Sequence, residues 1–297
     1  QRRVSALRMI GLSPFMPEMH QKVFNQLLHA PSTYRPGKKK HARSARRRGD
    51  PCPARTAFVC PRDGRDIACR HMIRLVLFDI DGTLLRTGGA GVWAFAETFS
   101  SEFGIVDGVA RLQFAGRTDS GLVREVFEAQ GVPATTANFQ RFYDRYTVLL
   151  EERLRHHAGE LVPGVEEFLR QLETLPQPPL IGLLTGNIRR GAEIKLRRHN
   201  LWERFAIGGF GDDHEDRNQI AAVARRRGCQ RLGVELAGGQ ILVVGDTPND
   251  IRCARAIHAR VLAVAADTEK LEELRAHQPD WLVEDFTQLS AAEICRG

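Results

Sequence analysis

The sequence predicts an α/β protein: a doubly wound parallel sheet with an inserted helical domain, preceded by a basic segment expected to be disordered. Three observations indicate this. From Met72 onward, short apolar runs alternate with amphipathic helical patterns, as expected for parallel strands and crossover helices. Residues 89–161 interrupt this alternation with helical patterns only, and residues 1–71 show almost no apolar periodicity.

Continuous apolar runs predict the strands, because parallel strands covered on both faces are apolar throughout. The runs are Leu75–Ile80, Leu180–Leu184, Ile241–Val244, Val261–Val264 and Trp281–Val283. Apolar residues spaced by three and four predict the helices between them. These are Gly164–Leu175, Gly191–His199, Asn218–Arg227, Asp250–Ile257 and Thr268–His277.

The insertion predicts a second, helical domain over residues 89–161. Its segments "VWAFAETFSSEFG", "GLVREVFEAQG" and "ANFQRFYDRYTVLLEERLRHH" all have helical apolar spacing, and no strand is expected there. Gly- and Pro-containing joints, "TGGAG" and "LVPG", suit a small domain that moves against the main one. The main domain is then formed by residues 72–88 and 162–297.

The first 71 residues carry the basic charge. They hold 16 Lys and Arg against 4 Asp and Glu, a net charge of +12, whereas the remainder carries −5 and the whole chain +7. Such a segment buries too little apolar surface to offset its ordering entropy, so we expect disorder. Three interpretations stay open: a segment without a role in the working protein, which Met72 before the first strand favours, nucleic-acid contact through "GKKKHARSARRR", or a targeting peptide.

Composition excludes several classes of protein. With 42% hydrophobic and 27% charged residues, the chain is typical of globular proteins, and no apolar run is long enough for a membrane helix. The six cysteines form no CxxC pair, so neither a zinc site nor a disulfide framework is expected. Free thiols favour a reducing compartment, and we expect a cytoplasmic protein.

Polar residues follow three of the predicted strands at the point where each ends. They are Asp79 and Asp81 in "LVLFDID", Thr185, Gly186 and Asn187 in "LIGLLTGN", and Asp246 and Asp250 in "ILVVGDTPND". Ligands of doubly wound sheets bind at the carboxyl ends of the strands, so these residues should share one pocket. Crowded carboxylates repel unless a cation intervenes, and oxygen ligands suit Mg²⁺.

This arrangement predicts phosphoryl transfer. With Mg²⁺ offsetting the repulsion between carboxylate and phosphate, Asp79 can attack phosphorus as a nucleophile. Asp81, two residues later, can protonate the leaving oxygen and then activate water. Backbone amides after Asp81 and Thr185, in Gly82, Gly186 and Asn187, can hold phosphate oxygens.

The three motifs "DIDGT", "LLTGN" and "GDTPND", in this order, resemble those of the haloacid dehalogenase superfamily of hydrolases. The helical insertion after the first strand resembles the cap domain of its phosphoglycolate-phosphatase-like group. The resemblance covers about Met72 to Phe286 and implies a Rossmann-like core. It also implies roles: Asp79 as nucleophile and metal ligand, Asp81 as acid/base with a metal-binding carbonyl, Asp246 as metal ligand supported by Asp250, and Thr185 as the phosphate-holding hydroxyl.

Two further site residues are expected from the same resemblance. The family usually places a lysine between the second and last motifs to pair with the nucleophile; here Arg217 stands in that region, and Lys195 is the alternative. In the cap, Arg117 of "FAGRTDSG" could reach a second anionic group of the substrate.

The resulting expectation is a Mg²⁺-dependent phosphatase of a small phosphorylated metabolite, with phosphoglycolate as the family-level substrate. An aspartate at position 81 favours phosphatase or phosphomutase over dehalogenase or ATPase chemistry. A phosphomutase acting on a sugar phosphate is the alternative, followed by a nucleic-acid-binding protein that uses the basic arm. No membrane partner is expected, and the protein is expected to be a monomer or homodimer.

Overall fold

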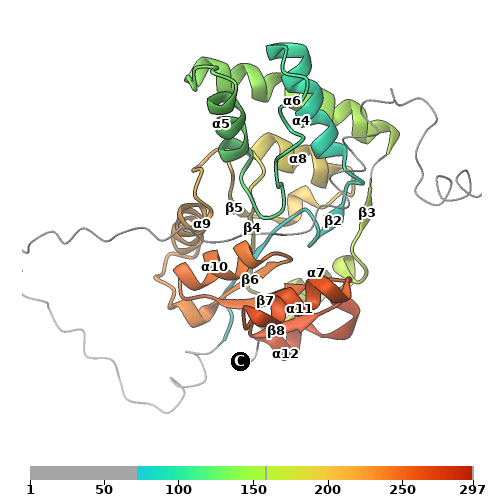
Figure 1. Ribbon diagram of the computed structural model, residues 1–297. Helices are drawn as coiled ribbons and strands as arrows, with labels where there is room; N and C mark the ends of the chain where they lie inside the picture. Colours follow the sequence, from blue (N-terminus) through green and yellow to red (C-terminus); the bar gives the residue numbers. More distant parts are fainter. Residues whose placement is uncertain (1–71, 158, 296–297) are drawn as a thin grey trace, which may run out of the picture. The chain divides into compact units, whose positions relative to one another are not determined.

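The computed structural model describes residues 72–157 and 159–295 (Figure 1). Predictions that concern residues 1–71, including the basic arm and three of the cysteines, lie outside this part of the chain. In the described part, no helix combines the length and the apolar character that crossing a bilayer requires. Its three cysteines, Cys229, Cys253 and Cys295, are buried free thiols.

The fold is the predicted parallel α/β sheet. Six parallel strands lie in the order β5-β4-β1-β6-β7-β8. They are β1 (Leu75–Phe78), β4 (Leu180–Leu184), β5 (Ile207–Gly209), β6 (Ile241–Gly245), β7 (Arg260–Val264) and β8 (Trp281–Val283). The five predicted runs form five of these strands: β4 and β8 have the predicted bounds, and β1, β6 and β7 each differ at one end by one or two residues. The strand β5 was not predicted, because "IGG" offers one apolar side chain instead of a run.

Helices cover both faces of the sheet, as the apolar strands require. Val76 and Phe78 of β1 pack into one cluster with α7 (Val165–Thr174), α8 (Arg189–Arg197) and α12 (Ala291–Cys295). Leu75 and Leu77 of the same strand pack on the opposite face. That layer holds α9 (Arg217–Leu232), α10 (Pro248–Ala256) and α11 (Thr268–Ala276). Because β1 lies between β4 and β6, its carboxyl end is next to the loops that carry the other two motifs, after β4 and after β6.

The insertion forms three helices with their own hydrophobic cluster. They are α4 (Ala90–Phe103), α5 (Asp119–Ala129) and α6 (Thr136–His156), at the top of Figure 1. Its centre is aromatic: Phe142 contacts the rings of Phe95, Phe99 and Tyr146 at centroid distances of 4.8, 4.6 and 6.0 Å. Apolar spacing alone therefore identified this segment correctly as helical.

One expectation about the insertion was wrong. Residues 89–161 were expected to hold no strand, but β3 (Glu160–Leu161) pairs antiparallel with β2 (Leu85–Arg86). The two segments enter and leave the helical insertion side by side, so their backbones pair over two residues. A pair this short leaves no periodicity in the sequence to detect.

We predict that Phe142→Ala lowers the free energy of unfolding by about 3–5 kcal/mol, because it leaves a cavity among buried rings. Urea denaturation measures the change. The matched control is Val148→Ala on the same helix, where the side chain is 55% exposed and the change should stay within about 0.5 kcal/mol. Equal effects of the two substitutions would contradict the packing described here.

Candidate active site

A tight turn brings the end of β1 against the end of β6. The Asp79 backbone N–H donates to the Val244 carbonyl at 2.9 Å, and the Gly82 N–H donates to the Leu85 carbonyl at 2.8 Å. Gly82 has a φ of 87°, and a Cβ there would lie 2.1 Å from a carboxylate oxygen of Asp246. Only glycine therefore allows both this conformation and this approach.

Three predicted carboxylates meet at this point. Asp79, Asp246 and Asp250 are buried, and each offers an oxygen within 4.8 Å of the others. The Nη2 group of Arg217 lies 3.1 Å from Asp79 Oδ1 and 2.5 Å from Asp250 Oδ1. The Lys270 ammonium pairs with Asp246, whose other oxygen accepts from the Thr83 hydroxyl at 3.3 Å.

The charges of this cluster do not balance. In the described part of the chain, two paired cations, Arg217 and Lys270, face three carboxylates. Burial raises the pKa of Asp79 to about 7 although the Arg217 guanidinium opposes the rise. Burial likewise raises the pKa of Asp246 to about 6, against the attraction of Lys270. Both shifts indicate negative charge that the neighbouring cations do not fully stabilise.

A divalent cation fits these residues. Opposite oxygen ligands of one Mg²⁺ lie about 4.2 Å apart, close to the spacing observed here, and carboxylate oxygens are the ligands it prefers. Both oxygens of Asp250 accept hydrogen bonds, from Arg217 and from the Thr247 backbone and hydroxyl, so this residue also holds Arg217 in place. The oxygens of Asp246 contact Lys270 and Thr83, so a metal ion would compete with Lys270 for this carboxylate.

A second polar network surrounds Asp81. The buried Lys195 ammonium donates to Asp81 Oδ2 and to Asn187 Oδ1, both at 2.6 Å. Asn187 Nδ2 donates to Asp81 at 2.8 Å and to the Thr185 hydroxyl at 2.9 Å. Of the two cations considered from sequence, Arg217 thus lies beside Asp79, whereas Lys195 lies beside Asp81.

A loop from the insertion closes over the site. A Cβ on Gly186 would lie 1.9 Å from the Arg117 carbonyl oxygen, and the Asp119 N–H donates to the Gly186 carbonyl at 2.8 Å. The Asp119 carboxylate accepts from the Ile188 N–H at 2.9 Å, and Asn249 donates to the Gly116 carbonyl at 2.8 Å. Main-chain contacts therefore dock this loop on both the second and third motifs.

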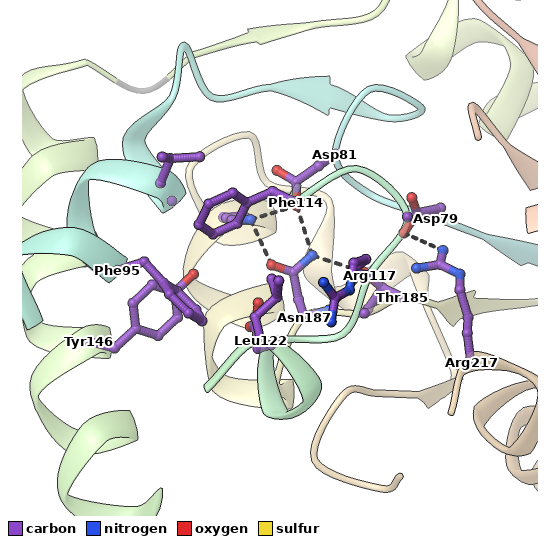
Figure 2. Close-up of a pocket in the computed structure, with 16 residues that line it drawn as sticks. Asp79, Asp81, Phe95, Phe114, Arg117, Leu122, Tyr146, Thr185, Asn187 and Arg217 are labelled. Carbon is purple, nitrogen blue, oxygen red and sulfur yellow. Dashed lines mark hydrogen bonds and ion pairs between the residues drawn. The ribbon is translucent and has the colours of Figure 1, made fainter. Parts of the chain in front are cut away.

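The two parts line a partly open cavity of about 110 Å³ (Figure 2). The sheet side contributes polar groups, Asp79, Asp81, Thr185, Gly186, Asn187, Lys195 and Arg217. The insertion contributes Gly91, Val92, Phe95, Phe114, Gly116, Arg117, Asp119, Leu122 and Tyr146. Arg117 lines the cavity, but its guanidinium pairs with Glu125 at 2.7 Å.

Sequence reasoning missed three residues of the site. Lys270 has no motif around it and reaches Asp246 only because β7 lies beside β6. Asp119 follows Thr118, the N-cap of α5, and lines the cavity through a loop docking that no sequence pattern indicates. Tyr146 belongs to the aromatic pattern of α6, which predicts core packing and gives no sign of the cavity.

Comparison with known proteins identifies the family. The model for haloacid dehalogenase-like hydrolases matches residues 76–264, more than half of the chain. The chain belongs to the haloacid dehalogenase-like hydrolase family. The resemblance seen in the three motifs is thereby confirmed, and the protein is a hydrolase of this family.

Curated relatives span the same region. A phosphoglycolate phosphatase of Synechococcus elongatus is 28% identical over 221 residues, covering 74% of this chain and 97% of the relative. A putative pyrophosphatase PpaX of Caldanaerobacter subterraneus is 26% identical over 224 residues, covering 73% of this chain and 93% of the relative. Among solved structures, CbbY of Rhodobacter sphaeroides in complex with phosphate is 20% identical with a TM-score of 0.58, covering 75% of this chain and 99% of its own. At this identity, the similarity shows the shared fold.

We predict that Asp79→Asn stabilises the metal-free protein more at pH 8 than at pH 4.5. The pKa of Asp79 rises from 3.8 to about 7 on folding, so the wild type loses stability as the pH rises from about 4 through about 7. Removing the carboxylate should recover on the order of a few kcal/mol at pH 8. Urea unfolding in chelator measures this; an equal gain at both pH values would contradict it.

We also predict that Lys270→Met tightens Mg²⁺ binding by about tenfold, because the ammonium and the metal ion compete for the Asp246 carboxylate. Isothermal titration calorimetry of the metal-free protein measures the dissociation constant. Arg275→Met, on the same helix but paired with exposed Glu272, is the control and should bind Mg²⁺ like the wild type. An unchanged dissociation constant in Lys270→Met would show that Lys270 does not compete with Mg²⁺ for Asp246.

Proposed function

We propose that this protein is a Mg²⁺-dependent phosphatase that hydrolyses a small phosphorylated metabolite through an aspartyl-phosphate formed on Asp79. The observation that carries the proposal is the meeting of Asp79 with Asp246, Asp250 and Arg217 in one buried cluster beside a small cavity. Family membership and relatives named phosphatases support the same reaction class. The fit of the carboxylate oxygens to one ion supports Mg²⁺.

Asp79 is the proposed nucleophile. Its carboxylate oxygen attacks phosphorus while the bond from phosphorus to the ester oxygen breaks. Asp79, Asp246 and the Asp81 carbonyl would hold Mg²⁺, and the bound ion would reduce the repulsion between the carboxylate and the phosphate. Arg217 holds Asp79 in place and supplies positive charge to the phosphoryl oxygens, the role expected of the family's lysine.

Asp81 is the proposed general acid and base. Protonated, it gives its proton to the leaving oxygen; as a carboxylate it then takes a proton from water, whose oxygen attacks the phosphorus of the aspartyl-phosphate. The bond to Asp79 breaks and inorganic phosphate departs. Lys195 and Asn187 hold the Asp81 side chain by one oxygen, which leaves the other oxygen for proton transfer.

The phosphate itself is proposed to lie among groups of the second motif. The Thr185 hydroxyl accepts from Asn187, which leaves its own O–H free to donate to a phosphate oxygen. The amides of Gly82, Gly186 and Asn187 are the further proposed donors. Residues 89–161 would act as a cap over a core of residues 72–88 and 162–297, excluding bulk water while the intermediate exists.

Phosphatase chemistry suits the small cavity better than the phosphomutase alternative. A mutase must bind a sugar phosphate in two orientations, and a cavity of about 110 Å³ holds little beyond a phosphate and a few atoms. The cytoplasmic location and the monomeric or homodimeric state stay predictions.

We predict that Asp79→Asn abolishes turnover of small phosphate esters in the presence of Mg²⁺, because the amide is a poor nucleophile. Release of inorganic phosphate measures the rate, and acid quenching with radiolabelled substrate should trap phosphate on the wild type alone. Asp107→Asn, an exposed aspartate of the insertion, is the control and should keep wild-type turnover. Wild-type rates in Asp79→Asn would refute the proposed nucleophile.

A further inference from the structure

The part of the cavity that would hold the leaving group, beside the phosphate, is small. With the loop around Arg117 docked on Gly186, the whole cavity, including the space for the phosphate, measures about 110 Å³. A cavity of about 150 Å³ holds one benzene molecule. The space that remains beside a phosphate therefore suits a leaving group of only a few non-hydrogen atoms.

On the side of the insertion, four apolar side chains line the cavity. They are Val92 and Phe95 of α4, Phe114 of the connecting loop and Leu122 of α5. Figure 2 shows Phe114 and Leu122 on either side of Asn187. Such walls suit a short carbon chain and provide no partner for a charged group.

One corner of the cavity is polar. If Gly91 carried a Cβ, that atom would lie 3.6 Å from the Lys195 ammonium and 3.7 Å from the Tyr146 hydroxyl, so both groups face the same small space. Lys195 uses two of its three N–H donors, on Asp81 and Asn187. Tyr146 is 1% exposed. Within the described residues, 72–157 and 159–295, its hydroxyl has no hydrogen-bond partner.

The Tyr146 hydroxyl lies at the cavity without a protein partner in the described residues, so it is available to hydrogen-bond a ligand atom. In Figure 2 its hydroxyl points away from the α6 backbone, toward the other residues that line the cavity. Two unused donors in one corner, from Tyr146 and Lys195, match an acceptor oxygen on the leaving group.

The charges around this corner disfavour an anion. Asp81 already matches the charge of Lys195, and the Asp119 carboxylate lines the same cavity without a cation paired to it in the described residues. The Arg117 guanidinium is paired with Glu125. Burial raises the pKa of Asp119 to about 6, which shows that negative charge here is already costly. A carboxylate or second phosphate on the leaving group would add another unmatched buried charge.

We infer that the substrate is the phosphate monoester of a short, uncharged hydroxy compound, such as a small diol, whose free oxygen binds Tyr146 and Lys195. Tyr146 is then a specificity-determining residue. This inference rests on the proposed phosphatase function and narrows its substrate class. It disfavours phosphoglycolate and pyrophosphate, which both carry an anionic leaving group.

The test uses four substrates of similar size that differ in the leaving group. These are hydroxyethyl phosphate, ethyl phosphate, phosphoglycolate and pyrophosphate, assayed with the full-length protein and Mg²⁺. We expect kcat/KM for hydroxyethyl phosphate to exceed that of the other three by about tenfold or more, since a site built to hydrogen-bond an oxygen discriminates against analogues without it. Equal or higher kcat/KM for phosphoglycolate or pyrophosphate would overturn the inference.

Tyr146→Phe tests the residue itself. The ratio of kcat/KM for hydroxyethyl over ethyl phosphate should fall about tenfold. Tyr143→Phe removes a hydroxyl from the same helix where it faces a different groove, and that ratio should stay within twofold of the wild type. Far-ultraviolet circular dichroism and thermal unfolding establish that both variants fold. A ratio that does not change in Tyr146→Phe would overturn the role of Tyr146.

The two proposals fail in different ways. If the wild type hydrolyses none of the four substrates with Mg²⁺, the inference fails; if it also releases no phosphate from a generic aryl phosphate, the phosphatase function fails with it. If the wild type hydrolyses the esters without preferring hydroxyethyl phosphate, the phosphatase function stands and the inference fails.

Discussion

The carboxylates of Asp79, Asp246 and Asp250 lie within 4.8 Å of one another where β1 and β6 end, and the rest of the site is arranged around the cost of burying them. Apolar strands covered on both faces bring the chain to this point with little access to water. Arg217 serves two of the carboxylates, and Lys270 serves the third. The negative charge that remains is what a divalent cation would offset.

The same constraint explains why the site divides into two functional halves. One half, around Asp79, holds buried negative charge that suits a metal ion. In the other half, Lys195 pairs with Asp81, and the insertion adds apolar side chains together with the Asp119 carboxylate and the Tyr146 hydroxyl. In the proposed function, the sheet would meet the electrostatic demands of phosphoryl transfer, and the insertion would select the leaving group.

Docking of the insertion uses main-chain groups of the motifs themselves. Gly186 leaves no room for a side chain under the Arg117 carbonyl, and Asp119 bonds to the backbone on both sides of Asn187. The glycine in the second motif is therefore required for the close approach of the loop above it. Because the loop and helices of the insertion line the cavity, relatives with the same motifs can differ in substrate through these segments alone.

The sequence by itself determined the sheet, the helical insertion and the positions of the motif carboxylates, because these depend on local periodicity and on the rule that parallel strands end at one edge. It predicted Arg217 and Lys195 as cations of the site but left open which one faces Asp79. Only the tertiary structure decided this, and only it brought Lys270, Asp119 and Tyr146 to the site. These residues carry no local signal: the packing of β7 beside β6 and of the insertion over the sheet decides which polar groups face a cavity and which lie in the core or on the surface.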